Sequence, residues 1–411
     1  MKACVFTLGC KMNEVESASL MSGLEELGYQ TTDIPEYADV YLINTCAVTA
    51  EAEKKSRQAI ARLRKFNQTA PVIVFGCAAE HSKSDFEARD GVLFVFGAQA
   101  KDRVLAQFKA GLSARVDHLH CSDEIFCELP DPKRVKTRAF VRIQDGCNHF
   151  CSYCIIPYLR GRTRSRSSES ILAEARSCGA KEIVLTGIDI SSYRSGGDGL
   201  GGLLKKLGAL DLRVRLGSVE AGLITREFLR QAKEAGNVAP HFHLSLQSGS
   251  NAVLKAMNRN YTREEYLEKC ALVYEYFSDA AVTTDIIVGF PSETEADFIE
   301  SLSIIGSAKF AHVHCFPYSP RKGTVAYRMK DLPAEVKRER MGRILKVAGD
   351  AEETYLARFA GRTLTALFEE DGGYTENYIR VYSEGAREGE LARVRLVKRE
   401  RDGFFAERIE V

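Results

Sequence analysis

The chain has 411 residues, 45% of them hydrophobic, and its 57 Lys and Arg nearly balance 56 Asp and Glu, leaving a formal net charge of +1. This size allows two or three domains with buried cores. No apolar run reaches the roughly 18 residues of a membrane span, and the N-terminus MKACVFTLGC lacks a signal-peptide pattern. We therefore expect a soluble cytoplasmic protein with no membrane partner, whose 12 cysteines bind metal and do not form a disulfide framework.

Strands alternate with helices in the first part of the chain. Residues 3–7, 39–45 and 70–76 are apolar runs typical of buried strands, and residues 14–28 and 50–67 between them have helical periodicity, with Gly28 and Asn67 as expected C-caps. This order predicts a parallel βαβαβ unit. We assign residues 1–130 to a first α/β domain, because the polar, proline-containing segment LPDPKRVKTR then reads as a linker.

Six further strands are predicted after the linker, separated by helical segments. They are residues 139–144, 182–188, 213–219, 241–247, 282–290 and 312–319. Two of the helices should begin with capping boxes, at Thr262 to Glu265 and at Thr294 to Asp297. The repeat predicts a partial (β/α)6 barrel over residues 137–358, with its working face at the C-terminal ends of the strands.

The last fifty residues have no helical period. Short strands at residues 363–370, 378–384, 391–398 and 404–411, with turns at 371–373 and 402–403, predict a small β-barrel over residues 361–411. The fold class is therefore α/β, with a parallel N-terminal domain, a partial barrel and a C-terminal β-barrel.

Three cysteines, Cys147, Cys151 and Cys154, lie close together directly after the first predicted barrel strand, with the spacing C-x3-C-x2-C. Three thiolates hold three corners of a 4Fe-4S cluster and leave the fourth iron open. A Cys3His zinc site that uses His149 is the alternative, although one compact loop is poor geometry for a closed tetrahedron. Tyr153 either packs on the cluster or belongs to the core.

A second trio lies in the first domain. Cys10, Cys46 and Cys77 each follow one of the three predicted parallel strands. Ligands bind at this edge of an open α/β sheet, where neighbouring strands are about 5 Å apart. The pattern favours a second cluster with three ligands and one open iron. Three unrelated buried thiols are the alternative.

The C-x3-C-x2-C loop, with an aromatic residue before its last cysteine at the end of a first barrel strand, resembles the radical S-adenosylmethionine (SAM) superfamily. There the open iron binds the amino and carboxylate groups of SAM, so the resemblance implies that Cys147, Cys151 and Cys154 hold the catalytic cluster. Polar groups at the strand ends would then face cofactor and substrate, and ordinary strand-end capping is the alternative for each of them. The cofactor-binding candidates are Tyr153, Glu220, Gln247 and Ser248, and Thr186, Asp189 and Asp285 lie at similar positions.

Over essentially the whole chain, TLGCKMNEVES, LINTCAVT, VFGCAAE, QDGCNHFCSYCIIPYLRGRTRSR, LSLQSGS, DIIVGFPSET and GYTENY resemble the methylthiotransferases. These enzymes insert a methylthio group into a C–H bond of a modified adenosine in tRNA or of a ribosomal-protein aspartate. The resemblance implies two 4Fe-4S clusters and SAM: one SAM methylates a sulfur on the Cys10/Cys46/Cys77 cluster, and a second yields the 5′-deoxyadenosyl radical that removes the hydrogen. It also implies a flavodoxin- or ferredoxin-type electron donor.

Within that family, Lys11, Glu16-Ser17 and the helix after Cys46 look most like the branch that acts on N6-threonylcarbamoyladenosine, next to the anticodon on its 3′ side. The alternatives are isopentenyladenosine in tRNA and the ribosomal-protein aspartate. A non-enzymatic metal protein that binds RNA is the alternative from another class. Ser292 departs from the family, which commonly has glycine there.

Positive charge is concentrated in the middle of the chain, because residues 1–130 and 361–411 are each net negative. Its densest run is LRGRTRSR, where we expect Arg160, Arg162, Arg164 and Arg166 to contact tRNA phosphates or the cluster surroundings. A solvated or internally paired face is the alternative. The last domain resembles the TRAM module, so Tyr374, Asn377 and Arg380 are further candidates for RNA binding, although that module is net acidic. Cys121 and Cys127 stay unassigned.

Overall fold

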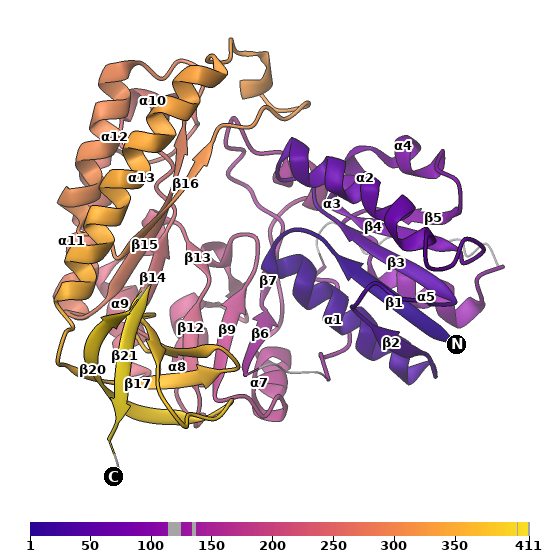
Figure 1. Ribbon diagram of the computed structural model, residues 1–411, viewed down its shortest axis with the longest axis horizontal. Coiled ribbons are helices and arrows are strands. Elements are labelled where there is room, and N and C mark those ends of the chain that lie inside the picture. The colour runs from indigo at the N-terminus through magenta and orange to yellow at the C-terminus, as the bar shows by residue number, and fades with distance from the viewer. Residues whose placement is uncertain (114–124, 134–136, 401, 410–411) are drawn as a thin grey trace.

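The computed structural model describes residues 1–113, 125–133, 137–400 and 402–409. Figure 1 shows an N-terminal α/β region in indigo, a central curved sheet covered by helices, and a small C-terminal barrel in yellow. The predicted fold class is confirmed in all three parts. Among these residues, no helix combines the length and the apolar character needed to cross a bilayer.

The N-terminal region is a five-stranded parallel sheet with helices on both faces. Its strand order is β2-β1-β3-β4-β5. The strands are β1 (Lys2–Thr7), β2 (Gln30–Thr32), β3 (Val40–Thr45), β4 (Val72–Gly76) and β5 (Val92–Phe96). One face packs on α1 (Lys11–Glu26) and α5 (Asp102–Ala110), and the other on α2 (Ala50–Arg64), α3 (Cys77–His81) and α4 (Lys83–Glu87). β3 and β4 are buried along their whole length, which is why their sequences read as continuous apolar runs.

The two expected C-caps differ in outcome. α1 ends at Glu26, and Gly28 two residues later has φ 86°, the left-handed conformation that glycine adopts readily. α2 ends at Arg64, before Asn67. The Asn67 side chain donates to the carbonyl of Ala38 instead of ending the helix.

The central region is an open parallel barrel. Its strands are β6 (Arg138–Arg142), β9 (Glu182–Thr186), β12 (Arg213–Leu216), β13 (Ser218–Val219), β14 (His241–Leu244), β15 (Ala281–Val288) and β16 (His312–Pro317). The strand expected at 213–219 is interrupted at Gly217, so that β12 pairs with β9 and β13 pairs with β14. At this break the chain leaves the three-stranded sheet β12-β9-β6 and enters the four-stranded sheet β13-β14-β15-β16.

Helices cover the outer face of this barrel. They are α7 (Ser168–Ser177), α8 (Leu200–Leu207), α9 (Arg226–Glu234), α11 (Arg263–Tyr276), α12 (Glu295–Ala308) and α13 (Ala334–Ala357). Both predicted capping boxes are confirmed, at the starts of α11 and α12. The core between the strands and these helices contains Ala139, Val141, Phe242 and Leu244. Because side chains alternate along a strand, the residues between them on β6 and β14 face the concave side of the barrel.

The C-terminal region is a closed five-stranded barrel in the order β17-β18-β19-β21-β20. The strands are β17 (Thr363–Glu369), β18 (Gly372–Thr375), β19 (Arg380–Tyr382), β20 (Leu391–Glu400) and β21 (Gly403–Arg408). The turn expected at 371–373 therefore already contains the start of β18, a strand that the sequence did not indicate.

This small barrel covers the N-terminal ends of the central strands. Arg213 and Arg215, on β12, donate to carbonyls of Thr365 and Thr375. The ring of Tyr378 stacks on His241, the first residue of β14, with centroids 4.7 Å apart. The C-terminal ends of the central strands thus stay open at the opposite end of the barrel.

Candidate functional site

The loop that carries Cys147, Cys151 and Cys154 leaves the C-terminal end of β6. A short strand, β7 (Gln144–Asp145), pairs with β8 (Arg164–Ser165) and folds the loop back on itself. Gly146 between β7 and Cys147 has φ 74°, and a Cβ there would lie 1.9 Å from the carbonyl oxygen of Arg162. Only glycine therefore fits at the entrance to the loop.

Backbone hydrogen bonds fix the rest of this loop. Cys147 N donates to Gly161 O at 3.1 Å, Cys154 N to Cys151 O at 2.9 Å, and Ser152 N to Met257 O at 2.9 Å. Burial raises the pKa of the Cys147 thiol to about 11 and of the Cys154 thiol to about 12, and the nearby Cys151 adds to both shifts. Three thiols on one short loop cannot readily ionise together without a cation to compensate them. The donor set therefore fits an iron–sulfur cluster.

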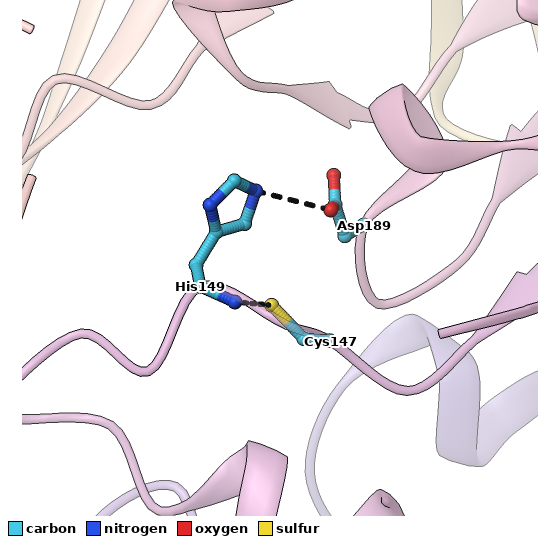
Figure 2. Close-up of side chains that lie close together, drawn as sticks. All are labelled: Cys147, His149 and Asp189. Carbon is cyan, nitrogen blue, oxygen red and sulfur yellow. Dashed lines mark hydrogen bonds and ion pairs between the residues drawn. The ribbon is translucent and has the colours of Figure 1, made fainter. Parts of the chain in front are cut away.

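His149 lies beside this trio, but its imidazole is turned to a carboxylate. Its Nε2 is 3.1 Å from Asp189 Oδ2, while its backbone N donates to Cys147 Sγ at 3.4 Å (Figure 2). The hydrogen bond with Asp189 raises the pKa of His149 against the effect of burial. One ligand atom each of Cys147, His149 and Asp189 lie within 4.8 Å of one another, so this corner alone could hold a metal ion. That set differs from the Cys3His set of the zinc alternative.

Asp189 also has a polar atom that needs a partner. Its Oδ1 is buried and has no hydrogen-bond partner in the part of the chain that the structure describes. A pocket of about 500 Å³ beside it is lined by His149, Asp189, Ser191, Ser192 and Glu220 among others. A bound ligand with a hydrogen-bond donor would satisfy this oxygen. SAM carries such donors in its amino group and its ribose hydroxyls.

A second pocket, of about 320 Å³, opens next to Cys151 and shares His149 and Glu220 with the first. Arg259 lines it and donates to Cys151 Sγ at 3.3 Å and to the Tyr261 hydroxyl at 3.0 Å, and it pairs with Glu220. The predicted site residue Glu220 therefore lies where a cofactor could reach it. Sequence reasoning missed Arg259 and Tyr261, because nothing in the sequence links them to a cysteine more than a hundred positions earlier.

The other cofactor candidates are less accessible. Ser248 has 0% exposure, and its hydroxyl lies 3.3 Å from that of Ser301 on α12, so it does not face either pocket. In this arrangement Ser248 packs against α12, and its contact with a cofactor stays a prediction. Gln247 has φ 74° and joins β15 through backbone hydrogen bonds with Asp285 and Ile287. Tyr153 packs against a small apolar cluster that includes Met257 and Phe290.

The first-domain trio converges at one edge of the N-terminal sheet. Cys10, Cys46 and Cys77 follow β1, β3 and β4, which are neighbours in that sheet. A Cβ on Gly9 would lie 2.5 Å from Cys46 Cβ, so the loop before Cys10 touches Cys46. The pKa of Cys46 is raised to about 11, chiefly by burial, and the nearby thiols of Cys10 and Cys77 contribute to this shift. Cys46 and Cys77 are buried and Cys10 is exposed. The donor set fits a second cluster with one open side.

Arg160 connects this trio to the barrel. It lies at the end of α6 (Ile156–Arg160), is 1% exposed, and donates to Cys77 Sγ at 3.3 Å. The same guanidinium donates to Glu16 at 2.9 Å and to Asp145 at 3.1 Å. Burial opposes ionisation of Glu16, but the charges of Arg160 and of Lys101 outweigh it and lower the pKa of Glu16.

Three of the four arginines expected to bind RNA are buried in such internal pairs. Arg160 has the partners just described, Arg164 lies 3.7 Å from Asp145, and Arg166 pairs with Glu128, Asp131 and Glu174. A tRNA phosphate would have to displace these buried ion pairs to reach them. Arg160 instead contacts Cys77, which agrees with the other expectation for this run, contact with the cluster surroundings. Arg162 is exposed, with its guanidinium 4.5 Å from the ring centroid of Phe150, and stays a candidate.

The RNA-binding candidates in the C-terminal barrel also differ in how far they are buried. Asn377 is buried, and its amide donates to Asp279 O at 3.2 Å, so it has a structural contact, and its contact with RNA stays a prediction. Tyr374 and Arg380 are half-buried, and Arg380 donates to the Tyr374 hydroxyl at 2.7 Å. The Tyr374 ring stacks on Tyr378 with centroids 4.7 Å apart. These two residues keep some exposed surface for a partner.

Two remaining features of the sequence have a definite place. Ser292 has φ 80°, the left-handed region in which glycine costs least, so glycine would fit this turn with less strain than serine. Cys127 is half-buried, and its carbonyl accepts a hydrogen bond from Arg142. Cys121 lies outside the described residues.

Comparisons with known proteins agree with this arrangement. The profile of the Radical SAM superfamily matches residues 141–305, and that of the Uncharacterized protein family UPF0004 matches residues 2–97. A solved structure of the radical SAM methyltransferase TsrM from Kitasatospora setae, with cobalamin and a [4Fe-4S] cluster bound, has a TM-score of 0.59 over 79% of this chain and 77% of its own at 14% identity. That likeness shows the fold alone. The open barrel and the three-cysteine loop define a radical SAM enzyme, a class that uses a 4Fe-4S cluster and SAM.

Sequence similarity to curated proteins shows which family within this class the chain resembles. Threonylcarbamoyladenosine tRNA methylthiotransferase MtaB of Bacillus subtilis (strain 168) is 37% identical over 95% of this chain and 93% of its own length. MtaB of Aquifex aeolicus (strain VF5) is 36% identical over 96% and 100%. The tRNA-2-methylthio-N(6)-dimethylallyladenosine synthase of Staphylococcus haemolyticus (strain JCSC1435) is 36% identical over 95% and 81%. The chain belongs to the family of radical SAM tRNA methylthiotransferases.

Proposed function

We propose that this enzyme converts N6-threonylcarbamoyladenosine, 3′ of the anticodon in tRNA, to its 2-methylthio derivative. The observation that carries the proposal is the end-to-end similarity to two MtaB proteins, which this chain covers over 93% and 100% of their lengths. The dimethylallyladenosine synthase is almost as similar in identity but is covered over only 81% of its length. Isopentenyladenosine in tRNA is therefore the second candidate substrate.

Lys11 supports the threonylcarbamoyl substrate on chemical grounds. The threonylcarbamoyl group carries a carboxylate, whereas the dimethylallyl group is purely apolar. Lys11 follows Cys10 directly, is exposed, and holds its ammonium 4.6 Å from the ring centroid of Phe140 on the concave face of β6. The ion pairs found among the described residues do not include Lys11. A cation of this kind, directly after Cys10 and over a ring of the central barrel, is suited to bind the substrate carboxylate.

The proposed cofactors are two 4Fe-4S clusters and SAM. Cys147, Cys151 and Cys154 would hold the cluster that binds SAM, and Cys10, Cys46 and Cys77 would hold the second. When bound, these groups supply the radical and the methylthio sulfur that conversion of an unactivated C–H bond to C–SCH3 requires. The residues of the chain bind and position these groups. The cofactor pockets are lined by Asp189, His149 and Glu220, and Arg259 orients Cys151.

The remaining parts of the proposal concern organisation and partners. The chain is divided into an N-terminal domain at residues 1–130, a radical SAM barrel at 137–358 and a TRAM-like barrel at 361–411. The tRNA approaches the open C-terminal ends of the central strands, where exposed Arg162 contributes positive charge. A cytoplasmic flavodoxin- or ferredoxin-type protein supplies electrons.

The test is mass spectrometry of tRNA nucleosides from cells with and without the protein. Loss of 2-methylthio-N6-threonylcarbamoyladenosine, with its unmethylthiolated precursor accumulating, is the expected result. Loss of the methylthiolated isopentenyl nucleoside instead would overturn the proposed substrate in favour of the second candidate. Unchanged nucleosides, with an altered ribosomal protein, would overturn both.

A further inference from the structure

Arg160 is the largest side chain among those with less than 2% exposure, yet the chemistry above does not use it. It belongs to the barrel by sequence, because it lies six positions after Cys154. Its guanidinium nevertheless lies in the N-terminal region, where Nε donates to Cys77 Sγ at 3.3 Å and Nη2 donates to Asn13 Oδ1 at 3.1 Å. One side chain thus contacts one cysteine trio while belonging to the segment that carries the other.

We propose that Arg160 is a positioning residue that couples the two cysteine sites and raises the reduction potential of a cluster held by Cys77. The inference rests on the proposed second cluster. A cationic hydrogen bond to a cysteine sulfur stabilises the more negative, reduced state of an iron–sulfur cluster, because added negative charge is compensated directly. Burial strengthens this effect, since Cys77 is only 3% exposed and water screens the contact little.

The surroundings of Arg160 favour this role over a simple structural ion pair. Four buried cations, Arg160, Lys101, Arg142 and Arg164, face two carboxylates, Glu16 and Asp145, within the same network. These groups therefore leave two positive charges in excess. The sulfur of Cys77 accepts from Arg160 inside this surplus, where the negative charge of a bound cluster would be compensated.

The same contacts tie both ends of the catalytic loop to the N-terminal region. Asp145, which accepts from Arg160 at 3.1 Å, lies two residues before Cys147, and Arg160 itself follows Cys154. The barrel trio has a comparable arginine, since Arg259 donates to Cys151 Sγ at 3.3 Å, but Arg259 faces an open pocket. Of these two arginines, Arg160 is the one that connects the barrel with the N-terminal region.

The experiment isolates the second cluster in the full-length chain. In a background with Cys147, Cys151 and Cys154 changed to alanine, anaerobically reconstituted protein is titrated with a reductant and followed by electron paramagnetic resonance. Arg160→Gln should shift the reduction potential of the remaining cluster to a lower value, and Arg160→Lys should restore part of the shift. Arg162→Gln is the matched control, because Arg162 is exposed and should leave the potential unchanged.

A second variant keeps the test decisive if Arg160→Gln fails to fold or to bind iron. Glu16→Gln retains Arg160 but removes its buried counter-charge, so the potential should shift to a higher value. An unchanged potential in iron-loaded Arg160→Gln, or in Glu16→Gln when the first variant does not load, would overturn the role of Arg160. Absence of any cluster in the parent background would instead overturn the proposed second cluster.

Discussion

Arg321 and Glu53 form a buried ion pair between the two large regions of the molecule, with Nη2 2.6 Å from Oε2. Arg321 follows β16 of the barrel, and Glu53 lies on α2 beside the first-domain trio. Burial of Glu53 opposes its ionisation, but hydrogen bonds from Arg321 and Ser82 and the Arg321 charge lower its pKa to about 2. Together with Arg160, this pair holds the N-terminal sheet against the cysteine loop.

Changing Glu53 to Gln should destabilise the closed arrangement by about 3 kcal/mol at neutral pH, because Arg321 is left buried without its charge partner. The pKa of Glu53 is lower in the folded protein than its ordinary value of 4.5. Its contribution is therefore complete above about pH 4.5 and is lost as the pH falls towards 2. Urea unfolding across this range should show a shallower acid decline for the variant. Glu87→Gln, at an exposed pair with Lys83, is the control, and an equal effect of both changes would contradict the prediction.

Iron content should report two independent clusters. Anaerobic reconstitution should load about eight irons per chain, since each cube holds four. Changing Cys147, Cys151 and Cys154 to alanine should leave about four, and so should the same change at Cys10, Cys46 and Cys77. Iron and protein analysis of the two variants checks this. Complete loss of iron in either one would mean that the two sites are not independent.

Lys11→Gln should lower kcat/KM on tRNA with N6-threonylcarbamoyladenosine by about ten- to a hundredfold, because a charged hydrogen bond contributes about 1.5–3 kcal/mol. Turnover of tRNA with isopentenyladenosine should not fall, since that group has no carboxylate. Lys11→Arg should retain most activity. If the threonylcarbamoyl substrate is modified equally well by Lys11→Gln, its carboxylate binds elsewhere.

The arginine run gives two opposite expectations. Arg162→Gln should weaken tRNA binding and reduce the slope of log affinity against log salt by about 1, because an exposed charge contacts phosphate. Arg164→Gln should chiefly lower stability, by about 3 kcal/mol, since it leaves Asp145 short of a buried partner. Salt-dependent binding and urea unfolding of both variants distinguish the two roles. A salt slope that changes only for Arg164→Gln would reverse the assignment.

Tyr378→Ala should loosen the C-terminal barrel. Its ring lies between His241 and Tyr374, with 4.7 Å between centroids on each side. Loss of a half-buried aromatic ring and both stacking contacts should cost about 2 kcal/mol. Thermal unfolding measures this, with Tyr37→Ala as an exposed control. Limited proteolysis that releases residues near 361–411 faster from Tyr378→Ala would locate the loosening, and equal rates would contradict it.

The sequence was sufficient to place both cysteine trios, because each cysteine follows an apolar strand and parallel strands end at one edge. For the arginine run, the sequence could not choose between tRNA phosphates, the cluster surroundings and internal pairing, for a physical reason. Charge density along a chain does not reveal partners that are distant in sequence, and the acids that neutralise Arg160 and Arg166 include Glu16 and Glu174. Sequence reasoning missed Arg259 because its partner Cys151 is also distant in sequence. The break at Gly217 was also invisible, since it depends on which sheet each half of the strand joins.

The closure of the molecule over Cys77 also constrains how the protein matures. Cys46 and Cys77 are buried, and Arg160, itself paired with Glu16, donates to the Cys77 sulfur from the barrel side. A protein that delivered the proposed second cluster would meet Cys10, the exposed member of the trio, but not the two buried cysteines in the closed form. Insertion of that cluster would then precede closure or reopen the boundary between the two regions. The newly made chain would pass through an open, cluster-accepting stage, and its lifetime is governed by the same buried ion pairs that later hold the enzyme shut.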